Sequence, residues 1–70
     1  MIKKGDKFIA KGDTPDVVYE IVDIKPKLLE ITDDNSIVEI QWFLREEKYE
    51  ATLKKGEIKF HIKNNTWFLI

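Results

Sequence analysis

Apolar and polar positions alternate with a period of two along much of this 70-residue chain. The clearest case is the segment IVEIQWFLR at 37–45. Because successive side chains of a strand point to opposite faces, one face of this segment carries Val38, Ile40, Trp42 and Leu44. The other face carries Ile37, Glu39, Gln41 and Phe43. The pattern predicts a strand with Trp42 in the core and Phe43 at least partly exposed.

Other short segments have strand composition, and turn-forming residues separate them. The expected strands are a short one over residues 7–11 within KKGDKFIAKGD at 3–13, VVYEIVDI at 17–24, LLEIT at 28–32 and YEATL at 49–53. The expected turns lie at 11–16, 25–27, 33–36 and 46–48. In 17–24, Tyr19 and Ile21 share a face but Ile24 falls on the other, so either a β-bulge intervenes or both faces are partly covered.

Short strands with turns about every 8 to 12 residues are typical of a small barrel or sandwich. At this length a barrel is more economical, because closure removes exposed edges. The sequence therefore predicts a mainly β fold, a small barrel of five or six antiparallel strands. The expected core residues are Phe8, Tyr19, Ile21, Leu29, Ile31, Val38, Ile40, Trp42, Leu53, Ile62, Trp67 and Leu69.

The C-terminal stretch EIKFHIKNNTWFLI, residues 57–70, fits two structures. As a β-hairpin turning at Asn64-Asn65, it places Phe60 and Ile62 opposite apolar residues of a last strand. As one short helix at 56–63, it turns Ile58 and Ile62 inward and leaves Phe60 roughly opposite them. The alternation favours the hairpin, and the helix stays open as the alternative.

Length and composition limit the classes of protein to which this chain can belong. Single cores take about 50 to 200 residues, so we expect residues 1–70 to form one domain. The chain has no Cys, and it has no run of about 18 apolar residues. We expect neither a membrane span nor a standard export signal, and a cytoplasmic location. The net charge of −1 is unlike that of a basic nucleic-acid module.

Catalytic and metal-binding patterns are sparse. His61 is the only histidine, and beside Lys59 and Lys63 it is typical of a solvated surface residue. The acidic pairs Asp33-Asp34 and Glu46-Glu47 lie in turn-like stretches, where solubility is the ordinary role. The sequence has no phosphate-binding glycine motif and no calcium-loop spacing. We therefore expect no enzyme, no metal site and no cofactor.

Several segments together resemble a class of very small proteins encoded by bacteriophages and prophages, mostly of unknown function. The segments are KKGDKFIA at the start, YEIVDI at 19–24, VEIQW at 38–42, Tyr49 with Leu53, and IKNNTWFLI at 62–70. The resemblance implies an SH3-like barrel, with a short helix before the last strand. It also implies a role as an inhibitor of a host or defence protein.

Two binding hypotheses follow for a chain without catalytic residues. The first is a protein partner, bound through exposed aromatics with acidic residues at the rim: Phe43, Tyr49, Phe68, Glu46 and Glu47. The second is nucleic acid, bound by a lysine patch beside aromatic residues: Lys54, Lys55, Lys59 and Lys63. The net charge favours the protein partner. The sequence leaves the oligomeric state open.

Overall fold

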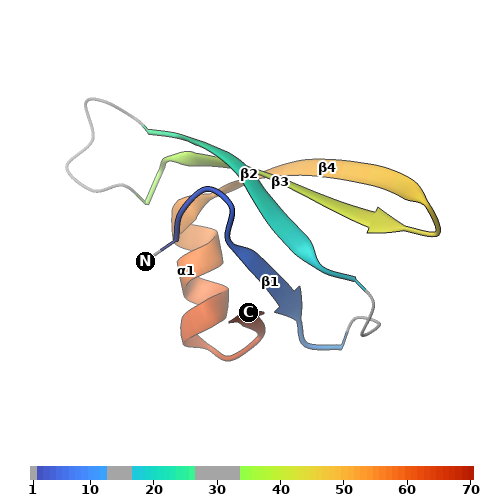
Figure 1. Ribbon diagram of the computed structural model, residues 1–70. Helices are drawn as coiled ribbons and strands as arrows, with labels where there is room; N and C mark the ends of the chain where they lie inside the picture. The colour runs from blue at the N-terminus through green and yellow to red at the C-terminus, as the bar shows by residue number, and fades with distance from the viewer. Residues whose placement is uncertain (1, 13–16, 27–33) are drawn as a thin grey trace.

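The computed structural model describes residues 2–12, 17–26 and 34–70 of the chain. Within them, the chain forms five strands and one helix (Figure 1). In chain order these are β1 (Lys7–Ala10), β2 (Tyr19–Lys25), β3 (Ile37–Leu44), β4 (Glu47–Lys54), α1 (Lys55–Lys63) and β5 (Trp67–Leu69). The strand expected at 28–32, with Leu29 and Ile31 as core residues, lies outside the described residues. In the part of the chain that is described, no helix is long and apolar enough to cross a membrane.

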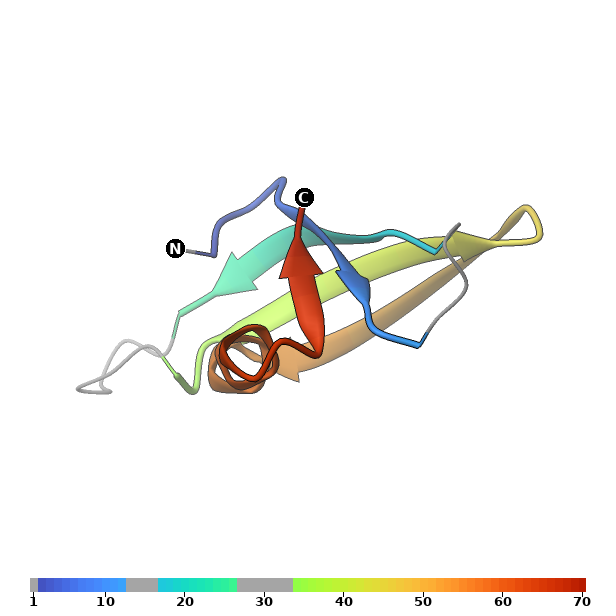
Figure 2. The same ribbon diagram turned by 90° about the horizontal axis from the view of Figure 1, so that it is seen from below.

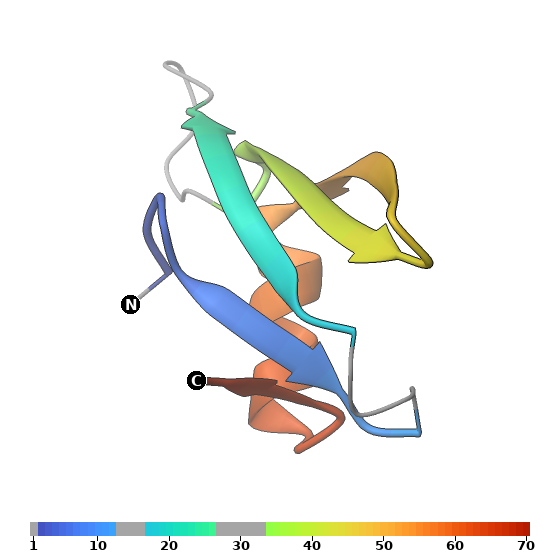
Figure 3. The same cartoon turned by 45° about the vertical axis from the view of Figure 1, so that its right-hand side comes forward.

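The strands form one antiparallel sheet in the order β4-β3-β2-β1-β5. The mainly β class and the five antiparallel strands are therefore confirmed. The sheet is not closed, because β4 and β5 are its two edges, so the predicted barrel is not confirmed. Figure 2 shows β5 beside β1, and Figure 3 shows α1 behind the sheet. The helix carries the chain from one edge to the other.

The C-terminal stretch contains the helix, so the hairpin interpretation is wrong. In α1, Ile58 is fully buried and Ile62 packs against the same core, while 61% of Phe60 is exposed. The spacing of four between Ile58 and Ile62 places both on one helix face. The alternation of Ile58, Phe60 and Ile62 fits a strand, but Ile58 and Ile62 fit the helical period equally well, and only Phe60 distinguishes the two.

Backbone carbonyl groups accept from two N–H groups in the first turn of α1. No side chain caps the helix at Lys54. Instead, the Lys55 N–H donates to the Ser36 carbonyl and the Gly56 N–H donates to the Asp34 carbonyl, each at 2.9 Å. A Cβ at position 56 would lie 3.2 Å from that Asp34 oxygen, which explains the glycine. The segment before β3 therefore fixes where the helix begins.

The Asn64-Asn65 pair ends α1. Asn64 is the C-cap, and Asn65 has a φ of 60°. The Asn65 N–H donates to the Ile62 carbonyl at 3.1 Å, and the Thr66 N–H donates to the His61 carbonyl at 2.9 Å. These two bonds form a Schellman motif, which satisfies carbonyls left without partners in the last turn. The predicted turn chemistry at Asn64-Asn65 is correct, although it ends a helix.

The core lies between the sheet and α1. Its buried apolar residues are Ile2, Phe8, Val17, Ile21, Val38, Ile40 and Ile58. Four of the expected core residues are among them, and five more are half-buried against this cluster: Tyr19, Trp42, Leu53, Ile62 and Trp67. The prediction for Leu69 is wrong, because 42% of it is exposed on the short edge strand β5. We call the sheet face that carries this cluster the inner face.

The turn between β3 and β4 is shorter than predicted. Leu44 pairs with Glu47, so the loop has two residues, Arg45 and Glu46. Their φ values are 52° and 67°, as in a type I′ hairpin turn. The prediction of a turn at 46–48 is therefore wrong by one or two residues, and Glu47 begins β4. In β2 the register shifts between Ile21 and Asp23, which selects the β-bulge from the two alternatives.

Candidate functional site

A continuous row of rings crosses the inner face of the sheet and continues onto α1. Neighbouring ring centroids are 4.2 to 5.8 Å apart. In spatial order the rings are Tyr49, Trp42, Tyr19, Phe8, Trp67, His61 and Phe60. Each strand of the sheet contributes at least one of them, so the row depends on the whole strand order.

Strand pairing explains the row. Trp42 pairs with Tyr49 across β3 and β4, and Phe8 pairs with Tyr19 across β1 and β2. Directly opposite residues of an antiparallel pair share a face, so their side chains meet. Trp67 joins the row because β5 pairs with β1, on the far side from β2. This last contact joins the two ends of the chain and cannot be derived from local alternation.

A groove of about 430 Å³ opens along this row. All five strands line it, mainly with apolar side chains: Phe8, Ala10, Tyr19, Ile40, Trp42, Ala51, Leu53 and Trp67. Lys11 adds a charged side chain to this lining. The volume lies in the range of ordinary ligand pockets, about 300 to 1,000 Å³. We call this the aromatic groove.

The rings cover much of one another's faces. Phe8 stacks on Tyr19 at an interplanar angle of 15° and on Trp67 at 21°. Trp67 stacks in turn on His61 at 24°. Ring edges and indole N–H groups are therefore the main surfaces left for a ligand. Ring edges carry the positive end of the aromatic quadrupole, so they favour hydrogen-bond acceptors such as peptide carbonyl groups.

Two of the residues that line the groove, Trp42 and Trp67, carry indole N–H groups. A tryptophan side chain can donate a hydrogen bond but cannot accept one. Neither Trp42 nor Trp67 donates to an acceptor within the part of the chain that the structure describes. Both residues are half-buried and both line the groove. The groove thus combines a mainly apolar lining with two tryptophans whose N–H groups make no hydrogen bond to the described residues.

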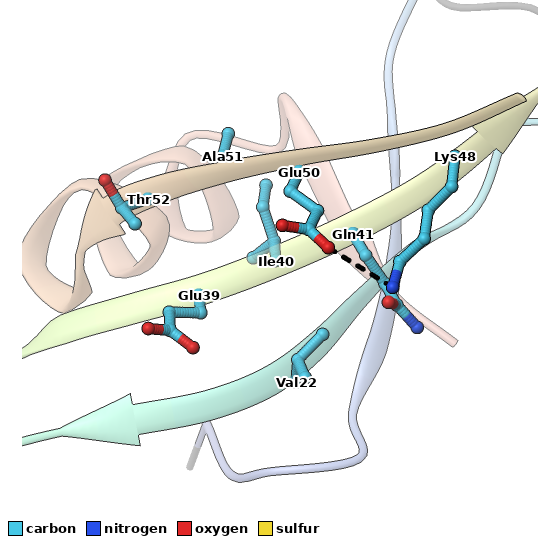
Figure 4. A pocket seen from close by; sticks show the side chains of 8 residues that line it. All are labelled: Val22, Glu39, Ile40, Gln41, Lys48, Glu50, Ala51 and Thr52. Atoms are coloured by element: carbon cyan, nitrogen blue, oxygen red, sulfur yellow. Dashed lines mark ion pairs between the residues drawn. The ribbon is translucent and has the colours of Figure 1, made fainter.

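A second hollow of about 390 Å³ lies across β2, β3 and β4, where outer-face side chains gather (Figure 4). Most of its polar side chains already have a partner, either within the lining or on β2. Lys48 Nζ lies 3.2 Å from Glu50 Oε1, and Gln41 Nε2 donates to Glu20 Oε1 at 2.9 Å. Glu39 pairs with Lys25 at 2.8 Å, and this ion pair raises the pKa of Lys25. The hollow is therefore a poorer candidate site than the aromatic groove.

Four of the five predicted protein-binding residues lie together near the end of the β3–β4 hairpin: Phe43, Glu46, Glu47 and Tyr49. The prediction that Phe43 is exposed is confirmed, with 57% of it accessible. Phe43 and Tyr49 are on opposite faces, because Tyr49 pairs with Trp42 on the inner face. The Tyr49 hydroxyl donates to Glu47 Oε2 at 3.1 Å.

Phe68 lies apart from that hairpin. It is exposed on β5 and pairs with Ile9 of β1. Two strands, β2 and β1, separate β5 from β3, so the structure does not bring Phe68 next to Phe43. Sequence reasoning assigned Trp42 and Trp67 to the core and missed their place in a groove. The alternation of the sequence turns Trp42 and Trp67 inward, like Tyr19 and Phe8, and this shared direction could be read from the sequence. Only the strand order shows that the four rings form a row.

The predicted lysine patch is divided between two elements. Lys54 is the last residue of β4, while Lys55, Lys59 and Lys63 recur at intervals of four along α1. Lys59 Nζ lies 2.9 Å from Asp34 Oδ1, so an acidic side chain is part of this surface. None of the four lysines lines the aromatic groove.

His61 has structural contacts at the end of α1. Its ring stacks on Trp67, and Nδ1 lies 2.9 Å from the Thr66 hydroxyl oxygen. That hydroxyl donates to the His61 carbonyl at 3.0 Å, so Nδ1 is best assigned as the donor to Thr66. His61 is thus a half-buried residue whose ring packs on Trp67 and whose hydrogen bond to Thr66 is exposed. Among the described residues, no cluster of three His, Cys, Asp or Glu residues could hold a metal ion.

Comparison with protein-family models, with curated proteins and with solved structures finds no match to this chain.

Proposed function

We propose that this protein is a non-catalytic binding module that holds an extended peptide segment of another protein in the aromatic groove. The observation that carries this proposal is the row of in-phase rings, four of which line a mainly apolar groove together with two tryptophan donors that no described residue occupies. An extended peptide supplies the hydrogen-bond acceptors that this lining lacks, because its carbonyl oxygens make no hydrogen bonds within the peptide.

Proline-rich segments are the favoured peptide chemistry. A polyproline II helix has no internal hydrogen bonds and presents its carbonyl groups outward. Aromatic-lined grooves recognise such segments because the peptide is already extended, so little entropy is lost on binding. Trp42 and Trp67 would donate to the carbonyl groups, and the rings would pack against the prolines.

The strand order also supports an SH3-like fold, which we propose as the fold type. The first strand lies between the second and the fifth, and α1 comes just before the last strand. On the resemblance to phage proteins alone, we further propose that the partner is a host or defence protein whose activity is blocked by binding.

The proposal is tested with intrinsic fluorescence, since both tryptophans of the chain line the groove. We expect proline-rich peptides to shift the emission on titration, and scrambled peptides without prolines to leave it unchanged. Ala10→Glu places a charge in the groove and should weaken binding by about ten-fold or more. If none of the proline-rich peptides shifts the emission, the proposed peptide chemistry is wrong.

A matched control is available on the same strand. Ile9 is half-buried like Ala10 but points to the opposite face. Ile9→Glu should therefore leave the affinity within about two-fold of the parent value. Melting curves of both variants separate loss of binding from loss of folding. Equal weakening by both variants would place the peptide outside the groove. Phe43→Ser tests the hairpin surface in the same assay.

Nucleic acid is the alternative partner. The intervals of four between Lys55, Lys59 and Lys63 favour it, because they align three positive charges along α1. Two observations weigh against it. Lys59 is paired with Asp34, and the Phe8 and Trp67 faces on which bases would stack are covered by neighbouring rings. Protein binding is therefore the favoured function.

A further inference from the structure

The strand β4 presents a long open edge. It pairs with β3 over eight residues without a register shift, and among the described residues no strand pairs with its other side. Natural proteins usually protect such an edge with a proline, a bulge or a very short strand. β5, at the other edge of the sheet, has only three residues. β4 has none of these three protections, and what opposes pairing with a further strand is its charged side chains, Glu47, Lys48, Glu50 and Lys54.

Charges along β4 discriminate between the ways in which two copies of it could pair. In a two-fold antiparallel pair centred on Glu50, this residue would face its own counterpart. Centring on Ala51 would place Lys48 opposite Lys54. Like charges directly opposite each other are destabilising, so both registers are disfavoured.

Centring the pair on Thr52 gives complementary contacts throughout. Glu50 then faces Lys54 of the second copy, and the symmetry repeats this ion pair. Thr52 faces its own counterpart, which is a favourable cross-strand pair. On the inner face, Ala51 meets the second copy's Leu53. The Glu50 side chain is 70% exposed despite its contact with Lys48, so it is accessible to a second chain.

We propose that two copies of this protein associate through their β4 edges, in the register centred on Thr52, to form one continuous antiparallel sheet. A two-fold axis makes the interface self-complementary, as in most homodimers. Ala51 and Leu53 line the aromatic groove, so the two grooves adjoin at the axis. The paired segment is short, residues 50–54, and we expect a weak dimer with a dissociation constant roughly in the micromolar range.

Sedimentation equilibrium of the full chain tests this proposal, from low micromolar to near-millimolar concentration. The mass should rise from 8.3 kDa toward twice that value. Glu50→Lys and Lys54→Glu should each raise the dissociation constant by about ten-fold or more, because each places two like-charge pairs at the axis. The double variant restores opposite charges and should return close to the parent value.

Exchange of one acidic and one basic residue on α1, Glu57→Lys with Lys63→Glu, is the matched control and should leave the association unchanged. Circular dichroism of every variant checks that it is folded. A mass of 8.3 kDa at every concentration would overturn the proposal. So would a dimer that tolerates both single reversals, or a double variant no better than the single variants, since either result excludes this register. The peptide assay compares variants on β1, which β2 and β3 separate from the β4 edge, so each proposal can fail independently.

Discussion

At the scale of single residues, Asn65 determines how α1 ends. Its φ of 60° lies in the left-handed region, which glycine adopts without steric cost. Asn65→Gly should therefore raise the free energy of unfolding by about 0.5 kcal/mol, or the melting temperature by roughly 2 to 4 °C. Urea denaturation or thermal melting measures this change.

Asn64 provides the control for this prediction. Its φ is −87°, an ordinary value at which glycine only adds flexibility to the unfolded chain. Asn64→Gly should lower the stability by a similar amount. If Asn65→Gly also destabilises the protein, the Schellman ending of α1 is wrong.

Such residue properties can be predicted from sequence because they are local. The tolerance of asparagine for positive φ identified the turn at Asn64-Asn65, whichever element preceded it. The same reasoning missed the turn at Arg45 and Glu46, because neither residue type favours a positive φ. There, the pairing of β3 with β4 determines the backbone. The role of His61 was missed for a related reason, since Trp67 reaches it only through tertiary folding.

At the scale of elements, the helix predicts very different effects on stability for substitutions at two residues two positions apart, Ile58 and Phe60. Ile58 is fully buried, whereas Phe60 is mostly exposed. Ile58→Ala should lower the free energy of unfolding by about 2 to 5 kcal/mol, a large part of the roughly 4 to 10 kcal/mol expected for this length. Phe60→Ala should change it by no more than about 0.5 kcal/mol. Chemical denaturation of both variants provides the measurement.

The hairpin interpretation makes the opposite prediction for Phe60, which would face Leu69 within a strand pair. A large loss of stability in Phe60→Ala would therefore support the hairpin and contradict the helix. Sequence reasoning could not decide between the two because Ile58 and Ile62 satisfy both periods. The decisive contacts are the carbonyl groups of Asp34 and Ser36, which accept from the first helical N–H groups. They lie about twenty residues upstream, beyond any local pattern.

At the scale of the whole molecule, strand order creates the candidate site. The alternation along 37–45 correctly separated Trp42 from Phe43, and the same reasoning placed Tyr19 and Phe8 inward. The row they form depends on β1 lying between β2 and β5. That order brings Trp67 against Phe8 and completes the groove. Sequence reasoning found its components, but it interpreted the half-buried rings as core and therefore looked for the site on the exposed hairpin.

The net charge of the whole molecule predicts that nucleic acid binds only weakly. The net charge is −1, and Asp34 neutralises part of the lysine patch through Lys59. A protein that neutralises several phosphates binds tightly at low salt and loses affinity steeply as salt rises. Labelled single-stranded and double-stranded oligonucleotides should therefore bind only weakly at 50 mM salt and not detectably at 200 mM salt. Asp34→Asn, which removes a negative charge from this surface, should strengthen the low-salt binding slightly, and Lys63→Gln should weaken it. Tight binding that falls steeply between the two salt concentrations would make nucleic acid the main partner.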